Sequence, residues 1–334
     1  MPSAVGVWTE GLRAAGELSA ILEHQREAFL RDGPPSLERR RADLAKLKQA
    51  VKDSAARIAD VISADFGNRS RHESLLAEVL VVCASIRHAL RHLPSWMKPK
   101  RVPVSFELKP GRGRILYQPV GVVGIISPWN YPFQLAIMPL IAALAAGNRV
   151  MLKPSELAPR TAEFIAELLG ALFPTDQVAT VLGDQEAGAE LARLPFDHLL
   201  YTGSTAIGRL VARAAAENLT PVTLELGGKS PCILGGDAAP PDAVESILYG
   251  KLLNAGQSCI APDYVLLPVA MREEFIRLAA EAVRKLYRPA SSGQETCWCN
   301  PRSLGKTNTS WLDPRLMARS GSSRAQPSLS ETLP

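Results

Sequence analysis

The chain has 334 residues, of which 46% are hydrophobic and 21% charged, and its formal net charge is +5. These fractions are close to those of globular proteins, so the chain as a whole is neither collagen-like nor disordered, and its length allows two or three domains. The basic residues are scattered along helix-like segments instead of gathering on one face, which argues against nucleic-acid binding. Five cysteines without regular spacing favour free thiols in a reducing compartment.

The N-terminal segment MPSAVGVWTEGLRAAGELSA lacks a basic start followed by an apolar core, so no signal peptide is expected. The longest apolar region is interrupted by prolines, and its clean stretch, residues 133–146, is shorter than the ~20 residues that a membrane span needs. These features predict a soluble, cytoplasmic protein with neither a membrane nor a nucleic acid as partner.

The N-terminal third is predicted to be helical. Residues 10–31 form the first predicted helix, and DGPPS separates it from the second. The second helix places Leu44, Leu47, Val51, Ala55, Ile58 and Ile62 on one inward face, and the third does so with Leu76, Val79, Cys83, Ile86, Leu90 and Leu93 before stopping at Pro94. Cys83 lies on that inward face and is expected to be a core residue.

A hairpin is predicted near residues 102–118, with KPGRG as its turn. From residue 119 short apolar strands alternate with helices, the strands being VGVVGIIS, NRVMLKPS, QVATVL, DHLLYTGS and PVTLELGG. This alternation predicts an α/β fold with a parallel sheet covered on both faces, which binds ligands where its strands end. A second α/β region is expected to begin near Gly227.

Two motifs at predicted strand ends suit a nucleotide. In YTGSTAIG, Gly203 and Gly208 would let the backbone and a helix N-terminus approach a phosphate, although a simple tight turn is the alternative. In LKPSE, Lys153 and Glu156 could hold ribose hydroxyls, although a solvated loop is the alternative. A carboxylate there would repel a 2′-phosphate, which favours NAD over NADP.

Three further motifs could carry chemistry. In SPWNYP, two prolines fix Trp129 and Asn130, whose amide could stabilise an oxyanion. In LELGGKSP, Glu225 at an apolar strand end would have a raised pKa suited to a general base, or would pair with Lys229. In NAGQSC, small neighbours leave room for Cys259 to act as a nucleophile, with a buried inert thiol as the alternative.

These five motifs, in this order and spacing, resemble the NAD(P)-dependent aldehyde dehydrogenase superfamily over residues 10–287. The segments FLRDGPPSLERRRADLAKLK, DFGNRSRHESLLAEV and NAGQSCIAPDYVL are more particularly similar to the bacterial coniferyl aldehyde dehydrogenases. The resemblance implies N-terminal helices and a Rossmann-like NAD-binding domain over residues 1–226, with a partial catalytic domain over 227–287.

The resemblance also implies roles for single residues. Cys259 would attack an aldehyde of aromatic, coniferyl type, while the Asn130 amide and the Cys259 N–H would hold the oxyanion. Glu225 would activate water. The cofactor would be NAD, with NADP as the alternative. The residues implied for cofactor binding are Ser127, Trp129, Lys153, Glu156, Gly203, Ser204, Gly208 and Leu226.

The sequence departs from the family after about residue 287. The family's later E-x-F-G-P motif and the C-terminal strand that completes its homo-oligomer are missing, and residues 289–334 contain nine Ser but no Val, Ile, Phe or Tyr. We expect a disordered tail that follows a truncation or frameshift, with no metal bound by its CWC segment. An inactive nucleotide-binding remnant and a non-redox thiol hydrolase are the alternatives to an active dehydrogenase.

Overall fold

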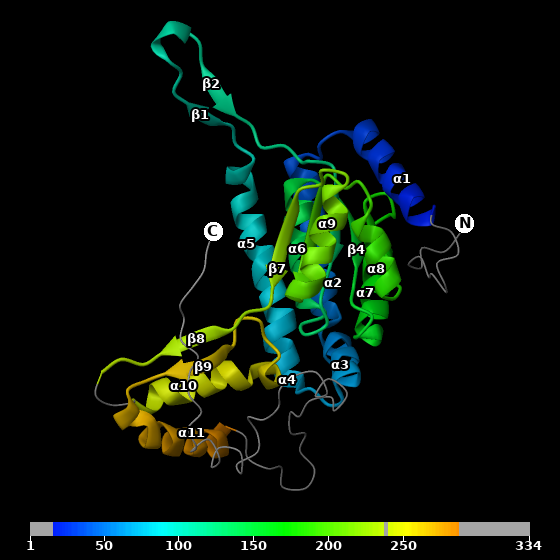
Figure 1. Cartoon of the computed structure of the whole chain (residues 1–334). Helices are drawn as coiled ribbons and strands as arrows, with labels where there is room; N and C mark the ends of the chain where they lie inside the picture. The colour runs from blue at the N-terminus through cyan, green and yellow to red at the C-terminus, as the bar shows by residue number, and fades with distance from the viewer. Residues whose placement is uncertain (1–15, 237–239, 287–334) are drawn as a thin grey trace.

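The computed structural model describes residues 16–236 and 240–286 (Figure 1). Its N-terminal part is helical, as predicted, and comprises α1 (Glu17–Asp32), α2 (Leu37–Asp53), α3 (Ala55–Phe66), α4 (Arg71–Ser74), a π-helical segment (Leu75–Leu80) and α5 (Val81–Trp96). The predicted second helix is two helices, because the chain leaves helical geometry at Ser54, where Asp and Ser are weak helix formers.

The end of α5 also differs from the prediction. The helix passes through Pro94 and ends at Trp96, where the Met97 N–H donates to Leu93 O at 3.1 Å. A proline so close to a helix end removes only one terminal hydrogen bond, so the last turn survives. Cys83 is 7% exposed and belongs to the core, as expected, and burial raises the pKa of its thiol.

A hairpin is present where predicted: β1 (Lys100–Val102) and β2 (Gly113–Ile115) pair antiparallel with Lys100 opposite Ile115. The predicted turn differs, because residues 103–112, with a 3-10 turn at Phe106–Leu108, connect the strands and KPGRG forms only the end of that connection. The hairpin projects from the rest of the chain as an arm (Figure 1). Phe106 near its tip is 81% exposed.

The central sheet contains β3 (Val122–Ile126), β4 (Arg149–Lys153), β5 (Val178–Thr180), β6 (His198–Gly203) and β7 (Val222–Leu226). Its order is β5-β4-β3-β6-β7 and all of its pairings are parallel, which confirms the predicted sheet. The connecting helices are α6 (Gln134–Ala146), α7 (Pro159–Leu172), α8 (Gln185–Ala192) and α9 (Thr205–Ala216).

Alternate residues of the strands feed two separate cores. Val123 and Ile125 pack with α2, α3, α5, α6 and α7 on one face, whereas Val122 and Ile126 pack with α1, α8 and α9 on the other. Burial on both faces explains the unbroken apolar strands of the sequence.

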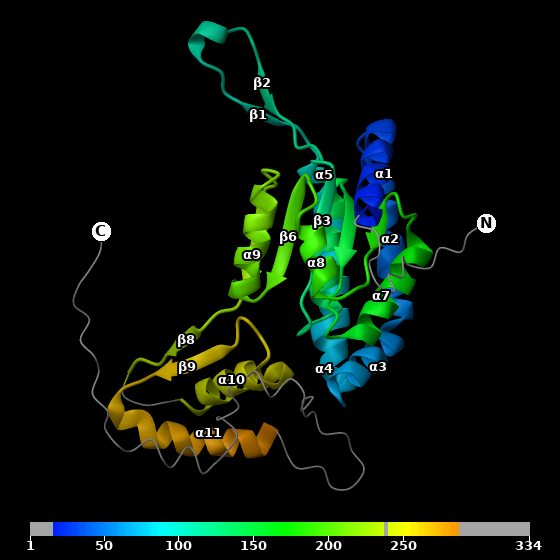
Figure 2. The ribbon, with the colours of Figure 1, turned by 45° about the vertical axis from the view of Figure 1, so that its right-hand side comes forward.

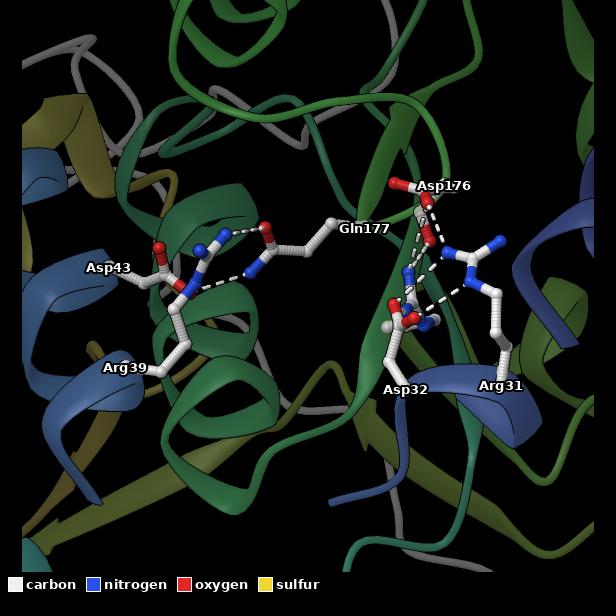
Figure 3. A network of polar contacts seen from close by, with 7 residues as sticks. Arg31, Asp32, Arg39, Asp43, Asp176 and Gln177 are labelled. Carbon is white, nitrogen blue, oxygen red and sulfur yellow. Dashed lines mark hydrogen bonds and ion pairs between the residues drawn. The ribbon is translucent and has the colours of Figure 1, made fainter. Parts of the chain in front are cut away.

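The first two helices are anchored to the sheet by polar contacts around β4 and the turn before β5 (Figure 3). Arg149 Nη2 lies 2.6 Å from Asp32 Oδ2 in α1, and Gln177 Nε2 donates to Asp43 Oδ2 in α2 at 2.7 Å. These contacts hold the helical N-terminal part against the sheet.

A second, smaller unit follows β7 (Figures 1 and 2). Its strands β8 (Ser230–Ile233) and β9 (Pro262–Leu266) pair in parallel, and α10 (Pro241–Leu252) and α11 (Arg272–Leu286) pack with them around Val244, Met271 and Leu278. The predicted tail, residues 289–334, lies outside the described residues. Within residues 16–236 and 240–286, none of the helices combines the length and the apolar character required to traverse a bilayer.

Leu140 on α6 tests the larger core because its side chain is fully buried. Replacing it with alanine should lower the free energy of unfolding by about 2–5 kcal/mol, through lost burial and a cavity. Chemical denaturation measures this, with Leu30→Ala as the matched control, since Leu30 is 81% exposed. Equal effects of the two substitutions would contradict the position assigned to α6.

Candidate active site

A cleft of about 910 Å³ lies between the carboxyl edge of the central sheet and the segment that follows α10. Ten of the eleven site residues predicted from the sequence line it: Ser127, Trp129, Asn130, Lys153, Glu156, Gly203, Ser204, Glu225, Leu226 and Cys259. The exception is Gly208.

The sheet topology explains this convergence. Ser127, Glu156, Ser204 and Leu226 lie at or just after the ends of four different strands, β3, β4, β6 and β7. Because these strands are parallel, their carboxyl ends lie along one edge. From β3 the chain continues through β4 and β5 on one side of β3, and then returns to β6 on the other side. The carboxyl edge between β3 and β6 is therefore the switch point where open α/β sheets bind ligands.

Ser204 caps the N-terminus of α9, where its hydroxyl accepts from the Ile207 N–H at 3.3 Å. At Gly203 a Cβ would lie 2.2 Å from the hydroxyl of Tyr201, so the turn needs a glycine. Burial raises the pKa of Tyr201, whose hydroxyl donates to Ser204 O at 3.5 Å. The amides of the first turn of α9 face a site suited to an anion.

Gly208 serves packing instead of lining the cleft. It is buried one turn into α9, and a Cβ there would lie 2.7 Å from Cδ2 of Leu226 on β7. The glycine thus lets the helix approach the strand, and its role in cofactor binding stays a prediction.

Lys153 and Glu156 form an ion pair, with Nζ 2.7 Å from Oε2. Lys153 is only 3% exposed, so the alternative of a solvated loop is wrong. Its aliphatic part lies along Gly188 of α8, where a Cβ would come within 3.4 Å of Cδ. Gly188 was missed by the sequence reasoning, because α8 carries no motif.

The Asn130 loop and the cysteine turn contact one another directly. The Asn130 side chain donates from Nδ2 to Gln257 O at 2.9 Å. In return, Asn254 Nδ2 donates to Asn130 O at 2.7 Å. Asn254 and Gln257 belong to the quoted NAGQSC motif, but the sequence alone assigned them no partner.

Cys259 is exposed in the turn after a short 3-10 segment (Leu253–Gly256), so the alternative of a buried thiol is wrong. Gly228 lies beneath it, and a Cβ there would be 2.9 Å from Cys259 O. Gly228 therefore admits the backbone of the cysteine turn.

Glu225 lines the same cleft but differs from expectation in its environment. We expected burial at an apolar strand end, yet Glu225 is exposed. β7 is the edge strand of the described sheet, so it is covered less completely than β3 or β4. The considered pairing with Lys229 is also wrong, because Lys229 Nζ lies 3.2 Å from Asp263 Oδ1.

No group of three or more metal-ligating side chains is assembled within the described ranges. The parallel sheet, the helix N-terminus at its edge and the exposed thiol define a class, that of α/β proteins with a nucleotide-type cleft and a cysteine beside it. The model of the aldehyde dehydrogenase family matches residues 12–301 of this chain. The chain belongs to the aldehyde dehydrogenase family.

Individual relatives agree. The chain is 46% identical over 291 residues to a probable coniferyl aldehyde dehydrogenase of Pseudomonas aeruginosa, covering 87% of this chain and 61% of that protein. A solved structure of Staphylococcus aureus AldH in a substrate-bound state superimposes with a TM-score of 0.79 at 36% identity, over 82% of this chain and 59% of that one. The crystal structure of a Mycobacterium tuberculosis aldehyde dehydrogenase complexed with NAD+ superimposes with a TM-score of 0.74 at 29% identity. The match covers 81% of this chain and 56% of that one. The chain thus spans about six-tenths of the length of these proteins.

The glycine pair after β7 provides a test of the site geometry. Gly228→Ala should destabilise the protein by about 1–3 kcal/mol, because the added methyl meets a backbone oxygen that cannot move alone. Gly227→Ala is the control, since nothing lies within 4 Å of a Cβ there, and it should stay within about 0.5 kcal/mol of wild type. Chemical denaturation compares them, and similar losses would show that Gly228 does not support the cysteine turn.

Proposed function

We propose that this chain carries the cofactor site and the nucleophile of an aldehyde dehydrogenase, which oxidises an aldehyde to the carboxylic acid with NAD. The observation that carries the proposal is the convergence of Cys259, Asn130 and Glu225 in one cleft with the N-terminus of α9. Membership of the family supports it.

The cleft suits a dinucleotide. Its volume, about 910 Å³, lies at the upper end of the range of about 300–1,000 Å³ for ligand pockets. The N-terminus of α9 at Ser204 would bind the pyrophosphate. Small and apolar residues of α8 and α9, including Gly188, Ala189, Ala192, Val211 and Ala214, line the cleft and would accept the flat face of adenine.

Glu156 supports NAD as the cofactor. One of its oxygens is held by Lys153 Nζ at 2.7 Å, which leaves the other able to accept from a ribose hydroxyl. A 2′-phosphate would bring negative charge against this carboxylate.

The proposed reaction begins with attack of the Cys259 thiolate on the aldehyde carbonyl carbon, which turns the carbonyl oxygen into an oxyanion. The Asn130 amide has two N–H groups; one donates to Gln257 O, and the second would donate to the oxyanion together with the Cys259 N–H. Lys153, Glu156 and Ser204 would hold the dinucleotide, which would supply an acceptor for the hydride of the aldehyde.

The thioester left on Cys259 would then be hydrolysed. Glu225 would take a proton from the attacking water, and the acid would leave with Cys259 regenerated as a thiolate. The exposure of Glu225 in the cleft supports this step, because water can reach its carboxylate.

An aromatic, coniferyl-type aldehyde is proposed as the substrate on the strength of the Pseudomonas relative. We propose a cytoplasmic location, supported by the free thiols of Cys83, Cys232 and Cys259, and assembly into a homo-oligomer like that of the family.

Substitution of the nucleophile tests the reaction. Cys259→Ala should lower NADH formation from NAD and coniferyl aldehyde by about 1,000-fold or more, as expected when a covalent step is removed. NAD affinity, measured by calorimetry, should stay unchanged. Unchanged turnover in the variant would contradict the assignment, and NAD binding by the wild-type protein without any NADH would favour the nucleotide-binding remnant.

The cofactor preference has its own test. Glu156→Gln should weaken discrimination against NADP by about tenfold, which corresponds to about 1.4 kcal/mol, because the repelling charge is gone. Calorimetric titrations with NAD and with NADP measure the ratio. Glu163→Gln, at an exposed position of α7, is the control, and an equal change in both variants would contradict a specific role for Glu156.

A further inference from the structure

The turn that leads to Cys259 has an unusual backbone. Asn254, Ala255 and Gly256 have φ values of 52°, 55° and 77°, so three consecutive residues lie in the left-handed region. Asparagine tolerates this region and glycine prefers it, but alanine does not. Such a conformation persists only where surrounding contacts fix it.

Asn254 supplies those contacts. It is 2% exposed, and its backbone N–H donates to Oε1 of Glu73, at the C-terminal end of α4. Its carbonyl oxygen accepts from both the backbone N and the side-chain Nε2 of Gln257, at 3.0 and 2.9 Å. The turn is therefore closed around a buried asparagine.

The side chain of Asn254 also joins the turn to the Asn130 loop. Its Nδ2 donates to Asn130 O at 2.7 Å and lies 3.4 Å from Gln257 O. Gln257 O in turn accepts from Asn130 Nδ2 at 2.9 Å, which requires the amide nitrogen of Asn130 to face the cysteine turn. The backbone of Asn130 and its amide orientation thus both depend on this turn.

The far end of the Asn130 loop is held from the same helical region. Glu78 is fully buried and accepts from the N–H groups of Phe133 and Gln134 at 3.1 and 2.7 Å. Arg69 Nη1 lies 2.7 Å from Glu78 Oε1, which balances the buried charge. Residues 69–78 therefore fix the Asn130 loop through Glu78 and the cysteine turn through Glu73.

We infer that Asn254, held by Glu73, is a positioning residue that sets the cysteine turn against the Asn130 amide. The inference rests on the proposed function, in which Cys259 and Asn130 act on one carbonyl. Asn254 itself touches neither the thiol nor the substrate in this account, and it acts through Gln257 and the Asn130 backbone.

The substitution Asn254→Asp tests this positioning role. It keeps the size of asparagine and its tolerance of positive φ, but it replaces two N–H donors by an oxygen that faces two carbonyl oxygens. Asn254→Asp should lower kcat by about 100-fold with the NAD dissociation constant unchanged within about twofold, because misplacement of reacting groups affects the chemical step. Asn218→Asp is the matched control, since the exposed Asn218 also donates to a backbone carbonyl, that of Arg193 at 2.7 Å.

Glu73 separates positioning from general stability. Glu73→Ala removes the acceptor of the Asn254 N–H and should lower kcat in the same way, whereas Glu73→Gln keeps an acceptor oxygen and should restore it. A merely structural role would lower the melting temperature without this split between kcat and cofactor affinity. Wild-type kcat in Asn254→Asp or in Glu73→Ala would overturn the inference, and the Glu73 pair decides the matter if Asn254→Asp does not fold.

Hydrogen exchange tests the inference independently of activity. In Glu73→Ala the amides of residues 254–258 should exchange about fivefold faster or more, the factor expected for the loss of one hydrogen bond, while the central sheet stays protected. The backbone amides of the Asn130 loop should also exchange faster in Glu73→Ala than in the wild-type protein. Unchanged exchange of both segments in Glu73→Ala would overturn the inference. If exchange in Glu73→Ala is faster but the wild-type protein shows no turnover, the result would count against the proposed function alone.

Discussion

The parallel arrangement of β3, β4, β6 and β7 is the constraint on which the site depends, because it brings four strand ends to one edge. Each strand end delivers a different element: the proline-bracketed Asn130 loop, the Lys153–Glu156 pair, the start of α9 and the Glu225 segment. Buried packing on both sheet faces holds these ends in place. Only the thiol comes from elsewhere, on the turn after α10.

The thiol must therefore be brought to the edge by contacts that link two separate sheets. Gly228 permits the approach, since a side chain there would collide with Cys259 O. The hydrogen bonds among Asn130, Asn254 and Gln257 then fix the two loops relative to one another. In the proposed reaction these hydrogen bonds hold the nucleophile and the oxyanion donor at one carbonyl, and the cofactor cleft lies beside the two loops.

Most of the fold could be predicted from the sequence, because it depends on local patterns. Apolar strands separated by helices predicted the parallel sheet, and the glycine that caps the end of α6, Gly147, is a common local signal for a helix end. The misjudged details, the break at Ser54 and the passage of α5 through Pro94, are decided by the balance of one or two hydrogen bonds. The positions of the motifs at strand ends also predicted which residues would line one cleft.

The contacts within the site could not be predicted in this way. Asn130 and Gln257 are 127 residues apart, and Glu73 and Asn254 are 181 apart, so no periodicity relates them. The exposure of Glu225 follows from the edge position of β7, which depends on sheet order. Gly208 and Gly228 occur in glycine-containing motifs, but only the packing shows that one admits Leu226 and the other the cysteine turn.

In the proposed reaction Cys259 forms a covalent intermediate with an aldehyde when NAD is present. Rapid quenching of the protein with NAD and coniferyl aldehyde, followed by mass spectrometry of its peptides, tests this directly. The proposed reaction should leave the acyl group of the aldehyde as a thioester on the peptide that contains Cys259, and only when NAD has been added. An unmodified Cys259, or an adduct on Cys232 in its place, would contradict it.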